Sequence, residues 1–237
     1  MRLNKYIASC GICSRRDADK LIDEGRVTVD GNKPVMGMQV DDSNIVMVDG
    51  VRISLIKEKT VLAYYKEVGV VCSERDEHAS KLITDVLKYP KRLTYAGRLD
   101  KDSEGLIIMT DDGDIIEAMM RGSKGHEKEY IVQVDKTVTE DFIKKMSDGI
   151  FLEELNVTTR KCTVSKIDEN VFSIILTQGF NRQIRRMCDA LGMKVISLKR
   201  IRVVNIRLND LKPGEYREIV GKELSELYRA CGMKAGS

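Results

Sequence analysis

The chain has 237 residues and a mass of 26.8 kDa, which leaves room for one ordinary domain and one small domain. Hydrophobic residues make up 42% of it and charged residues 32%, the balance of a soluble globular chain, and no apolar stretch reaches the roughly 18 residues that a membrane helix needs. A formal net charge of only +3 excludes a uniformly basic binding protein, so any surface that binds a polyanion must be local.

Residues 1–5 lack the apolar core of a signal peptide, and we therefore expect a cytoplasmic protein. Among the six cysteines, Cys10 and Cys13 alone have the spacing of metal ligands. No second pair completes a tetrahedral site, and His78 and His126 lie far away in the sequence. We predict reduced thiols and no structural metal.

A small first domain is predicted at residues 1–48, followed by a lysine-rich linker at residues 49–59. Its helix begins after a capping serine, Ser14, and ends at Gly25. Two short apolar strands follow, each closed by a turn dipeptide. They are residues 26–29 with Asp30-Gly31, and residues 45–48 with Asp49-Gly50.

Two arginines, Arg15 and Arg16, occupy the first turn of that helix, where the helix dipole disfavours positive charge. The placement makes sense if the helix end and the arginines together hold a phosphate. Chance placement is the alternative, because Asp17 and Asp19 partly offset the charge.

A second domain is predicted at residues 60–231, where strands and helices mix without a regular alternation. Its predicted strands are residues 61–66, 106–109, 128–134, 157–164, 171–176 and 195–208. Its predicted helices are residues 80–87 (capped by Ser80), 114–120, 139–146, 181–191 and 222–231. The polar segment 122–127 is expected to be mobile. We therefore predict the α+β class, with a mixed, largely antiparallel sheet flanked by helices.

The loop before the strand at residues 106–109 contains the tripeptide Arg98-Leu99-Asp100, bracketed by Gly97 and Gly105. It offers the Asp100 carboxylate, beside a cation, on a short tether to a rigid strand. Catalytic side chains are often found in that setting. The alternative is a solvated acidic loop, since Asp102 and Glu104 follow.

Positive charge is concentrated in residues 181–207, which contain eight cations against one anion, Asp189. A basic segment on a nearly neutral protein is the electrostatic mark of a polyanion partner, although a solvated face would have the same composition. The helical spacing of the arginines beside an apolar stripe could send one guanidinium inward to a carboxylate while the others meet phosphate. The cations are Arg182, Arg185, Arg186, Lys194, Lys199, Arg200, Arg202 and Arg207.

Tyr130 follows a charged segment at the head of a predicted strand. Aromatic residues are 5% of the chain and tryptophan is absent, so a ring that stacks on a nucleobase must be Phe or Tyr. Tyr130 could supply that ring, or it could be a tyrosine half-buried on the sheet.

Residues 1–31 resemble the S4 RNA-binding module, an αL-type fold. The matching stretches are Arg2-Leu3-Asn4-Lys5-Tyr6, Cys13-Ser14-Arg15-Arg16-Asp17-Ala18, and Leu21-Ile22 through Gly25-Arg26-Val27-Thr28-Val29-Asp30-Gly31.

Three later motifs resemble those of the RsuA-type ribosomal RNA pseudouridine synthases. They are Gly97-Arg98-Leu99-Asp100 with Ser103-Glu104-Gly105-Leu106, then Lys128-Glu129-Tyr130, then Gly179-Phe180-Asn181-Arg182-Gln183-Ile184-Arg185-Arg186-Met187. Their order behind an S4-like unit makes the resemblance specific and extends it over nearly the whole chain. His126-Glu127 before the second motif and Met187-Cys188 after the arginines of the third lean toward the RluF branch, which acts on large-subunit RNA.

The resemblance implies a role for several residues. Asp100 matches the catalytic aspartate, Tyr130 the tyrosine that stacks on the target uracil, and Arg185 the basic partner of the aspartate. Arg98 matches the arginine that helps to hold the nucleotide out of its helix. The other RNA-binding candidates are Arg15, Arg16, Lys20, Arg182, Arg186, Lys199, Arg200 and Arg202.

The reaction that the resemblance implies breaks the N1–C1′ bond of uridine, rotates the uracil and joins its C5 to C1′. It is an isomerisation, so we expect no cofactor and no metal. We expect 23S ribosomal RNA as the partner and a monomeric protein. A non-catalytic S4-type RNA-binding protein is the main alternative, and a carboxylate-dependent phosphate-ester hydrolase is a third.

Overall fold

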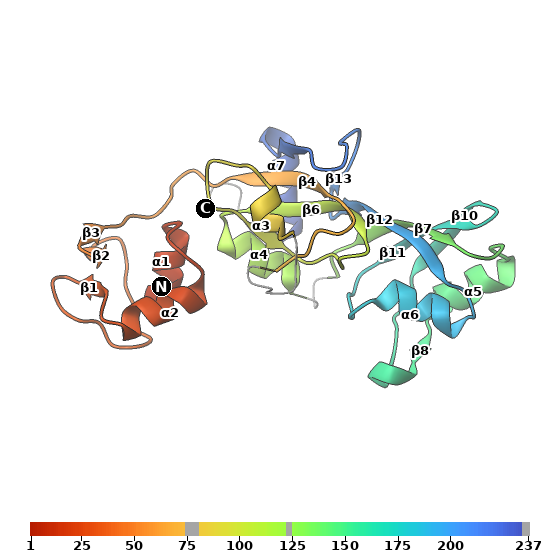
Figure 1. Cartoon of the computed structure of the whole chain (residues 1–237), viewed down its shortest axis with the longest axis horizontal. Coiled ribbons are helices and arrows are strands. Elements are labelled where there is room, and N and C mark those ends of the chain that lie inside the picture. Colours follow the sequence, from red (N-terminus) through yellow and green to blue (C-terminus); the bar gives the residue numbers. More distant parts are fainter. Residues whose placement is uncertain (74–80, 122–124, 234–237) are drawn as a thin grey trace. The chain divides into compact units, whose positions relative to one another are not determined.

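The computed structural model describes residues 1–73, 81–121 and 125–233, which form two compact units (Figure 1). The first comprises Met1–Thr60, Tyr89–Arg92 and Asp111–Gly113, and the second comprises Val61–Lys88, Leu93–Thr110 and Asp114–Ser237. None of the described helices has the length and apolar character needed to cross a membrane.

The first unit packs two helices against a small antiparallel sheet of order β1-β2-β3. As predicted, the Ser14 side chain caps the second helix by accepting a hydrogen bond from the Asp17 backbone N–H at 3.2 Å. Leu3, Tyr6 and Ile7 of the first helix are buried, so it contributes to the core although the sequence did not predict it. The elements are α1 (Leu3–Ser9), α2 (Arg15–Asp23), β1 (Val27–Val29), β2 (Val46–Val48) and β3 (Val51–Arg52).

Strand β3 lies where the sequence predicted a linker. Asp49 and Gly50 both have positive φ, at 49° and 77°, and this tight turn returns the chain to pair β3 with β2. Ile53 follows and is buried in the same core. The linker therefore begins later than predicted, because a hairpin consumes its first residues.

The second unit is built on a nine-stranded sheet within the described residues, of order β10-β11-β7-β12-β6-β4-β14, with β13 paired to β12 and β5 to β6. Among the described strands of this sheet, only the pairing of β12 with β6 is parallel, so the predicted mixed, largely antiparallel α+β architecture is confirmed. The strands are β4 (Val61–Lys66), β5 (Thr94–Ala96), β6 (Glu104–Thr110), β7 (Lys128–Val134), β10 (Thr163–Asp168), β11 (Val171–Leu176), β12 (Val195–Val203), β13 (Ile206–Arg207) and β14 (Tyr216–Glu218).

Two apolar clusters hold the helices to this sheet. One packs α4 (Gly113–Met120) and α7 (Gly221–Ala230) against β4 and β6. The other packs α5 (Glu140–Asp148) and α6 (Gln183–Ala190) against β7, β11 and β12. Every residue of β4 is buried, which explains why it reads as a continuous apolar run rather than an alternating one.

Three predicted elements differ from the structure. The long strand at residues 195–208 is a hairpin of β12 and β13, and Val204 makes its turn with a φ of 56°. The strand at residues 157–164 is divided between β9 (Val157–Thr158), which pairs with β8 (Phe151–Leu152), and β10. Helix α3 covers only Ile83–Val86, and its predicted cap Ser80 lies outside the described residues, as do residues 122–124 of the polar segment.

Candidate active site

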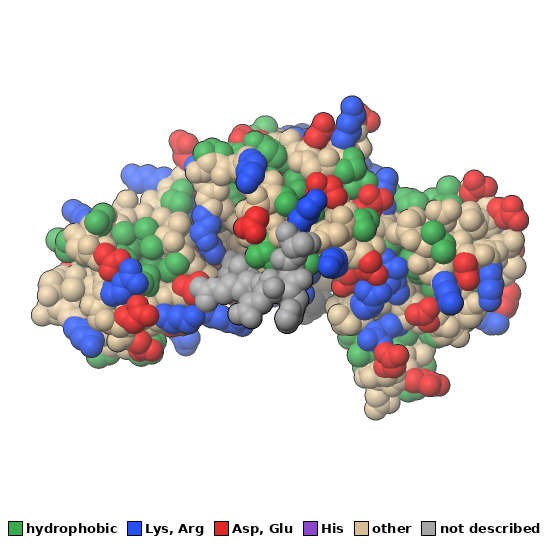
Figure 2. All heavy atoms as spheres, in the orientation of Figure 1, with side chains coloured by type: hydrophobic (Ala, Val, Ile, Leu, Met, Phe, Trp, Pro, Cys, Tyr) green, Lys and Arg blue, Asp and Glu red, His purple; other side chains and the backbone are tan. Residues whose placement is uncertain are grey.

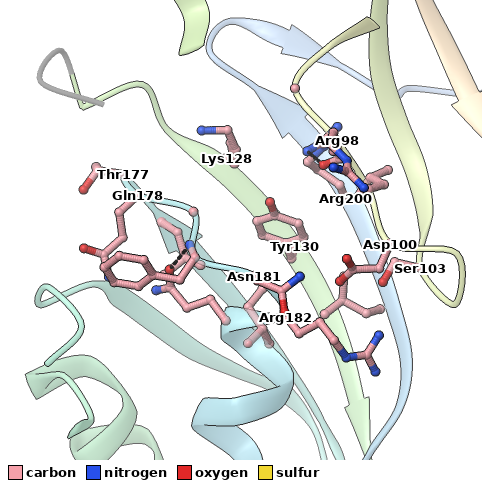
Figure 3. A pocket seen from close by; sticks show the side chains of 18 of the residues that line it. Arg98, Asp100, Ser103, Lys128, Tyr130, Thr177, Gln178, Asn181, Arg182 and Arg200 are labelled. Carbon is pink, nitrogen blue, oxygen red and sulfur yellow. Dashed lines mark hydrogen bonds between the residues drawn. The ribbon is translucent and has the colours of Figure 1, made fainter. Parts of the chain in front are cut away.

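A pocket of about 420 Å³ opens over strands β7 and β12 of the second unit (Figure 3). The loop between β5 and β6 forms one wall, and the segment between β11 and α6 forms the other. The pocket brings together six residues predicted from the sequence, which are Arg98, Asp100, Tyr130, Arg182, Arg185 and Arg200.

Asp100 lies on the first wall, half-buried, with its carboxylate facing the pocket (Figure 3). The buried Leu99 side chain anchors the loop on one side, and a hydrogen bond from the Ser103 N–H to the Asp100 carbonyl, at 3.1 Å, closes it on the other. Among the described residues, Asp100 forms no ion pair, so its carboxylate is available to a substrate.

Gly105 sets how closely the loop approaches β12. Its φ is 108°, and a Cβ at this position would lie 2.3 Å from the Arg200 carbonyl oxygen. Since no side chain fits such a contact, glycine is required for β6 to pair in parallel with β12 directly behind Asp100.

Arg200 is buried, with 2% of its surface exposed, and so is not the surface phosphate contact that the sequence predicted. Arg200 is paired with Tyr130 in the β12–β7 register, so its side chain lies on the same face of the sheet as the pocket. Its Nε donates to the Leu106 carbonyl at 2.7 Å and its Nη1 to the Arg98 carbonyl at 3.2 Å. Arg200 thus holds the two ends of the Asp100 loop.

Tyr130 stands on β7, between Ile174 of β11 and Arg200 of β12. Its ring is half-buried against the second apolar cluster and occupies the middle of the pocket, with Asp100 to one side (Figure 3). A planar ring fixed by packing in an open pocket can support a flat ligand such as a nucleobase.

The sequence predicted that Arg185 pairs with Asp100. In the structure, Arg185 contacts the same loop at Asp102 instead. Its Nη2 donates to the Asp102 carbonyl at 2.8 Å and to Ser103 Oγ at 3.4 Å. Its Nε lies 3.3 Å from Asp102 Oδ2, an ion pair without hydrogen-bond alignment. The Asp102 side chain points to the start of α6, where Arg185 lies.

Arg182 completes this contact as a bidentate partner of Asp102, with Nη1 and Nη2 at 3.1 and 2.8 Å from the two carboxylate oxygens. Burial disfavours the charged form of Asp102, but the hydrogen bond from Arg182 and the charge of Arg185 outweigh it and lower the pKa of the carboxyl. Two arginines on one carboxylate leave a net positive charge at the pocket rim.

Three more predicted RNA-binding residues have partners within the protein. Arg202 donates to Glu129 and Glu127 at 2.8 and 2.9 Å, and 12% of its side chain is exposed, so its charge is already neutralised. Side chains alternate along β12, so Lys199 lies on the face opposite to Arg200. Its Nζ is 5.6 Å from the centre of the Tyr65 ring. Arg186 pairs with Glu154.

The remaining predicted cations lie on α2 in the first unit. Arg15, Arg16 and Lys20 are exposed, and Lys20 lies 3.6 Å from Asp17. Cationic and acidic side chains intersperse over the face shown in Figure 2, in keeping with the small net charge.

The sequence assigned no individual role to Lys128, Gln178 and Asn181, yet all three line the pocket. The signal for Lys128 was present, because it lies two residues before Tyr130 on a strand and so shares its face. The loop residues Gln178 and Asn181 offered no periodicity from which to infer this position.

No disulfide bond joins any of the six cysteines, all of which lie in the described residues. No group of three His, Cys, Asp or Glu side chains suited to a metal ion occurs in the described ranges.

The sequence matches two families. Residues 60–190 match the family described as RNA pseudouridylate synthase, and residues 1–33 match the S4 domain. The first match covers more than half of the chain and contains most of the pocket.

Individual relatives extend over nearly the whole chain. It is 42% identical to the dual-specificity RNA pseudouridine synthase RluF of Escherichia coli K12, over 97% of this chain and 79% of that one. It is 33% identical to the ribosomal large subunit pseudouridine synthase B of Bacillus subtilis, over 95% of each chain. A solved pseudouridylate synthase structure superposes with a TM-score of 0.71 at 28% identity, covering 96% of this chain and 99% of that one.

Proposed function

This chain belongs to the RNA pseudouridylate synthase family, whose members isomerise uridine in RNA, and we propose that its target uridine lies in large-subunit ribosomal RNA. The Bacillus subtilis relative, named for the large ribosomal subunit, supports this substrate. The match to RluF, 42% identical over 97% of this chain, supports the same branch of the family. A ribosomal substrate in turn supports action in the cytoplasm. The non-catalytic alternative has no support in these relatives.

Asp100 is the residue that we assign to the covalent chemistry. When the N1–C1′ bond breaks, an ionised carboxylate either attacks C1′ or assists removal of a sugar proton. The observation that carries this assignment is the meeting of Asp100 and Tyr130 in one pocket, from a loop and a strand that are separate in the sequence. The absence of an ion pair on Asp100 among the described residues leaves its oxygens free to react.

Tyr130 would support the flipped base. Leaving the RNA stack costs a few kcal/mol, and stacking on an aromatic ring offsets about 1–3 kcal/mol of it. Arg98 is exposed at the mouth of the same pocket, where it can occupy the place that the flipped nucleotide leaves or hold its phosphate.

Arg185 would act through the loop rather than on Asp100 directly. Its bonds to the Asp102 carbonyl and to Ser103 Oγ fix the loop residues that follow Asp100. Loss of these bonds would loosen the nucleophile, and small misplacements of reacting groups cost large factors in rate.

The S4 unit would supply affinity for RNA. Arg15 and Arg16 extend from the first turn of α2, whose free N–H groups favour an anion. Together with Lys20 they give the unit a phosphate-binding edge.

Tritium release provides the test, because the C5 hydrogen of uridine is lost when C5 joins C1′. Transcripts of large-subunit RNA labelled with 5-tritiated uridine should release about one tritium per molecule in the presence of the protein. Small-subunit RNA and transfer RNA transcripts serve as comparison substrates, and Asp100→Asn as the inactive control. Release from a comparison RNA alone would contradict the large-subunit assignment while leaving the isomerase activity intact.

A further inference from the structure

The floor of the pocket carries a cation, Lys128, that has no role in the proposed function. Lys128 stands on β7 two residues before Tyr130, on the same face of the strand, and both side chains line the pocket (Figure 3). It is half-buried, unlike the exposed Arg98 at the mouth.

Lys128 has no counter-ion in the part of the chain that the structure describes. Within the described residues, the hydrogen bond of its side chain runs from Nζ to the His126 carbonyl at 3.5 Å, the limit of such a bond. The neighbouring carboxylates, Glu127 and Glu129, alternate to the other face of the strand, where both bind Arg202.

Burial, and after it the nearby charge of Arg200, lower the pKa of the Lys128 ammonium. A half-buried cation that lacks a partner is a costly arrangement. The cost is offset if the pocket receives negative charge at this position during the reaction.

The reaction generates such a charge. When the N1–C1′ bond breaks, its electron pair stays with the uracil, which becomes an anion with charge spread over N1 and the carbonyl oxygens. After rotation, C5 bonds to C1′, C5 gives up its proton and N1 gains one, so the product is an isomer of the substrate. The uracil is thus anionic only after the N1–C1′ bond has broken and before the C5–C1′ bond has formed.

We propose that Lys128 is a catalytic residue whose ammonium hydrogen-bonds a carbonyl oxygen of the uracil stacked on Tyr130 and stabilises the uracil anion after the N1–C1′ bond breaks. Lys128 stays protonated throughout and transfers no group. This assignment rests on the stacking role proposed for Tyr130. A donor fixed where charge develops accelerates a reaction because its attraction is stronger in the transition state than in the ground state.

A phosphate contact is the competing role for a lysine in an RNA-binding protein. Lys128 is less suited to it than the arginines at the rim, because it rises from the sheet floor beside the ring on which the base would lie. The phosphate-contacting role predicts a weaker complex and a flatter salt dependence of binding, whereas anion stabilisation predicts a slower reaction in a complex of normal strength.

The test compares Lys128→Gln, Lys128→Arg and the wild type in single-turnover assays at saturating RNA. Removal of one such donor typically costs about 10²–10³-fold in rate, so we expect Lys128→Gln to be about 100-fold slower. Lys128→Arg, which keeps the charge, should stay within about tenfold of the wild type. The matched control is Lys166→Gln, an exposed lysine of β10 outside the pocket, which should react at the wild-type rate.

A substrate with a better leaving group separates this role from a merely structural one. Fluorine at C5 withdraws electrons and stabilises the uracil anion by itself. The deficit of Lys128→Gln in consuming 5-fluorouridine RNA should therefore be at least about tenfold smaller than its deficit with uridine RNA. A residue that only shapes the pocket would show equal deficits with both substrates.

Three results would overturn the proposal: a Lys128→Gln rate within threefold of the wild type, equal deficits with the two substrates, or weaker binding with a flatter salt slope at an unchanged saturated rate. If Lys128→Gln failed to fold, as judged by circular dichroism, Lys128→Met and Lys128→Arg would provide the comparison instead. A wild-type protein that releases no tritium from any RNA would instead contradict the proposed function.

Discussion

Asp102 and Arg182 face each other across the rim of the pocket, with both Nη atoms of the guanidinium at 3.1 and 2.8 Å from the two carboxylate oxygens. Asp102 also forms an ion pair with Arg185, so both arginines are bound to Asp102 and not to Asp100. Asp100 therefore keeps an unpaired carboxylate among the described residues. We therefore propose different tasks for the two acids of this loop: Asp102 holds the loop in place, and Asp100 takes part in the chemistry.

Asp100→Asn should abolish isomerisation and leave RNA binding nearly unchanged. The amide keeps the shape of the side chain but cannot act as a nucleophile or base. Loss of a covalent nucleophile costs several decades of rate, so residual activity should lie below about 1% of the wild type. Tritium release and filter binding on the same preparation measure both quantities. Activity well above that level would remove Asp100 from the chemistry.

Asp102→Asn should change how stability depends on pH. The pKa of Asp102 is lowered in the folded state from the ordinary value of an aspartate, so its stabilising contribution is present above about pH 4 and is lost as pH falls through the lowered pKa. Because the carboxylate and the Arg182 side chain are both nearly half exposed, the contribution belongs to the small range of surface pairs.

Urea unfolding between pH 3 and pH 6 measures this contribution. The free energy of unfolding of the wild type should fall more steeply with acid than that of Asp102→Asn, and the two curves should converge at the lowest pH. Asp141→Asn, an exposed acid that pairs with Lys145 far from the pocket, is the control for general acid effects. Parallel curves for wild type and Asp102→Asn would contradict the pairing.

Gly105→Ala should strongly destabilise the protein. A Cβ there would meet the Arg200 carbonyl oxygen at 2.3 Å, in a backbone conformation that disfavours side chains. We expect a loss of more than about 3 kcal/mol in the free energy of unfolding, because both strain and backbone displacement contribute. Gly192→Ala is the matched control, since its φ is also positive, at 73°, with no atom within 4 Å of the added Cβ. It should cost only about 1–2 kcal/mol.

Apolar periodicity was enough to predict most of the sheet. Strands β4, β6 and β7 were found because burial on one or both faces leaves a direct pattern in the sequence. The turn at Val204 and Asn205 was missed because a β-branched residue such as Val204 rarely adopts a positive φ, and Asn205 was the sole turn-favouring residue there. β14, which has two exposed residues of three, left almost no hydrophobic signal.

The residues of the pocket could be predicted more easily than their pairings. Motif order identified Asp100 and Tyr130, which do meet in the pocket. It could not tell Asp100 from Asp102 as the partner of Arg185. Two acids that lie two residues apart on one loop differ only in the direction in which their side chains point. A count of charges likewise grouped Arg200 with the surface cations, whereas its side chain is buried beside Tyr130 in the strand register.

Salt dependence of RNA binding should distinguish arginines that meet phosphate from those that brace the pocket. Arg16 is exposed on the S4 unit, and a phosphate contact there releases counterions. Arg16→Ala should therefore flatten the slope of log K against log salt by roughly 0.7–0.9, with little change in the rate at saturating RNA. The side chain of Arg185 is 12% exposed and already contacts Asp102, so Arg185→Ala should leave the slope unchanged.

The rate should respond in the opposite way. Without Arg185, the bonds to the Asp102 carbonyl and Ser103 Oγ are lost, and Asp100 becomes less well oriented. We expect a fall of about 10–100-fold in the saturated rate, the scale of a misplaced catalytic group. Binding titrations at four salt concentrations, paired with single-turnover tritium release, measure both effects on each variant. If Arg185→Ala flattened the slope and kept the wild-type rate, Arg185 would be a phosphate ligand, and Arg182 would be the residue that positions the loop.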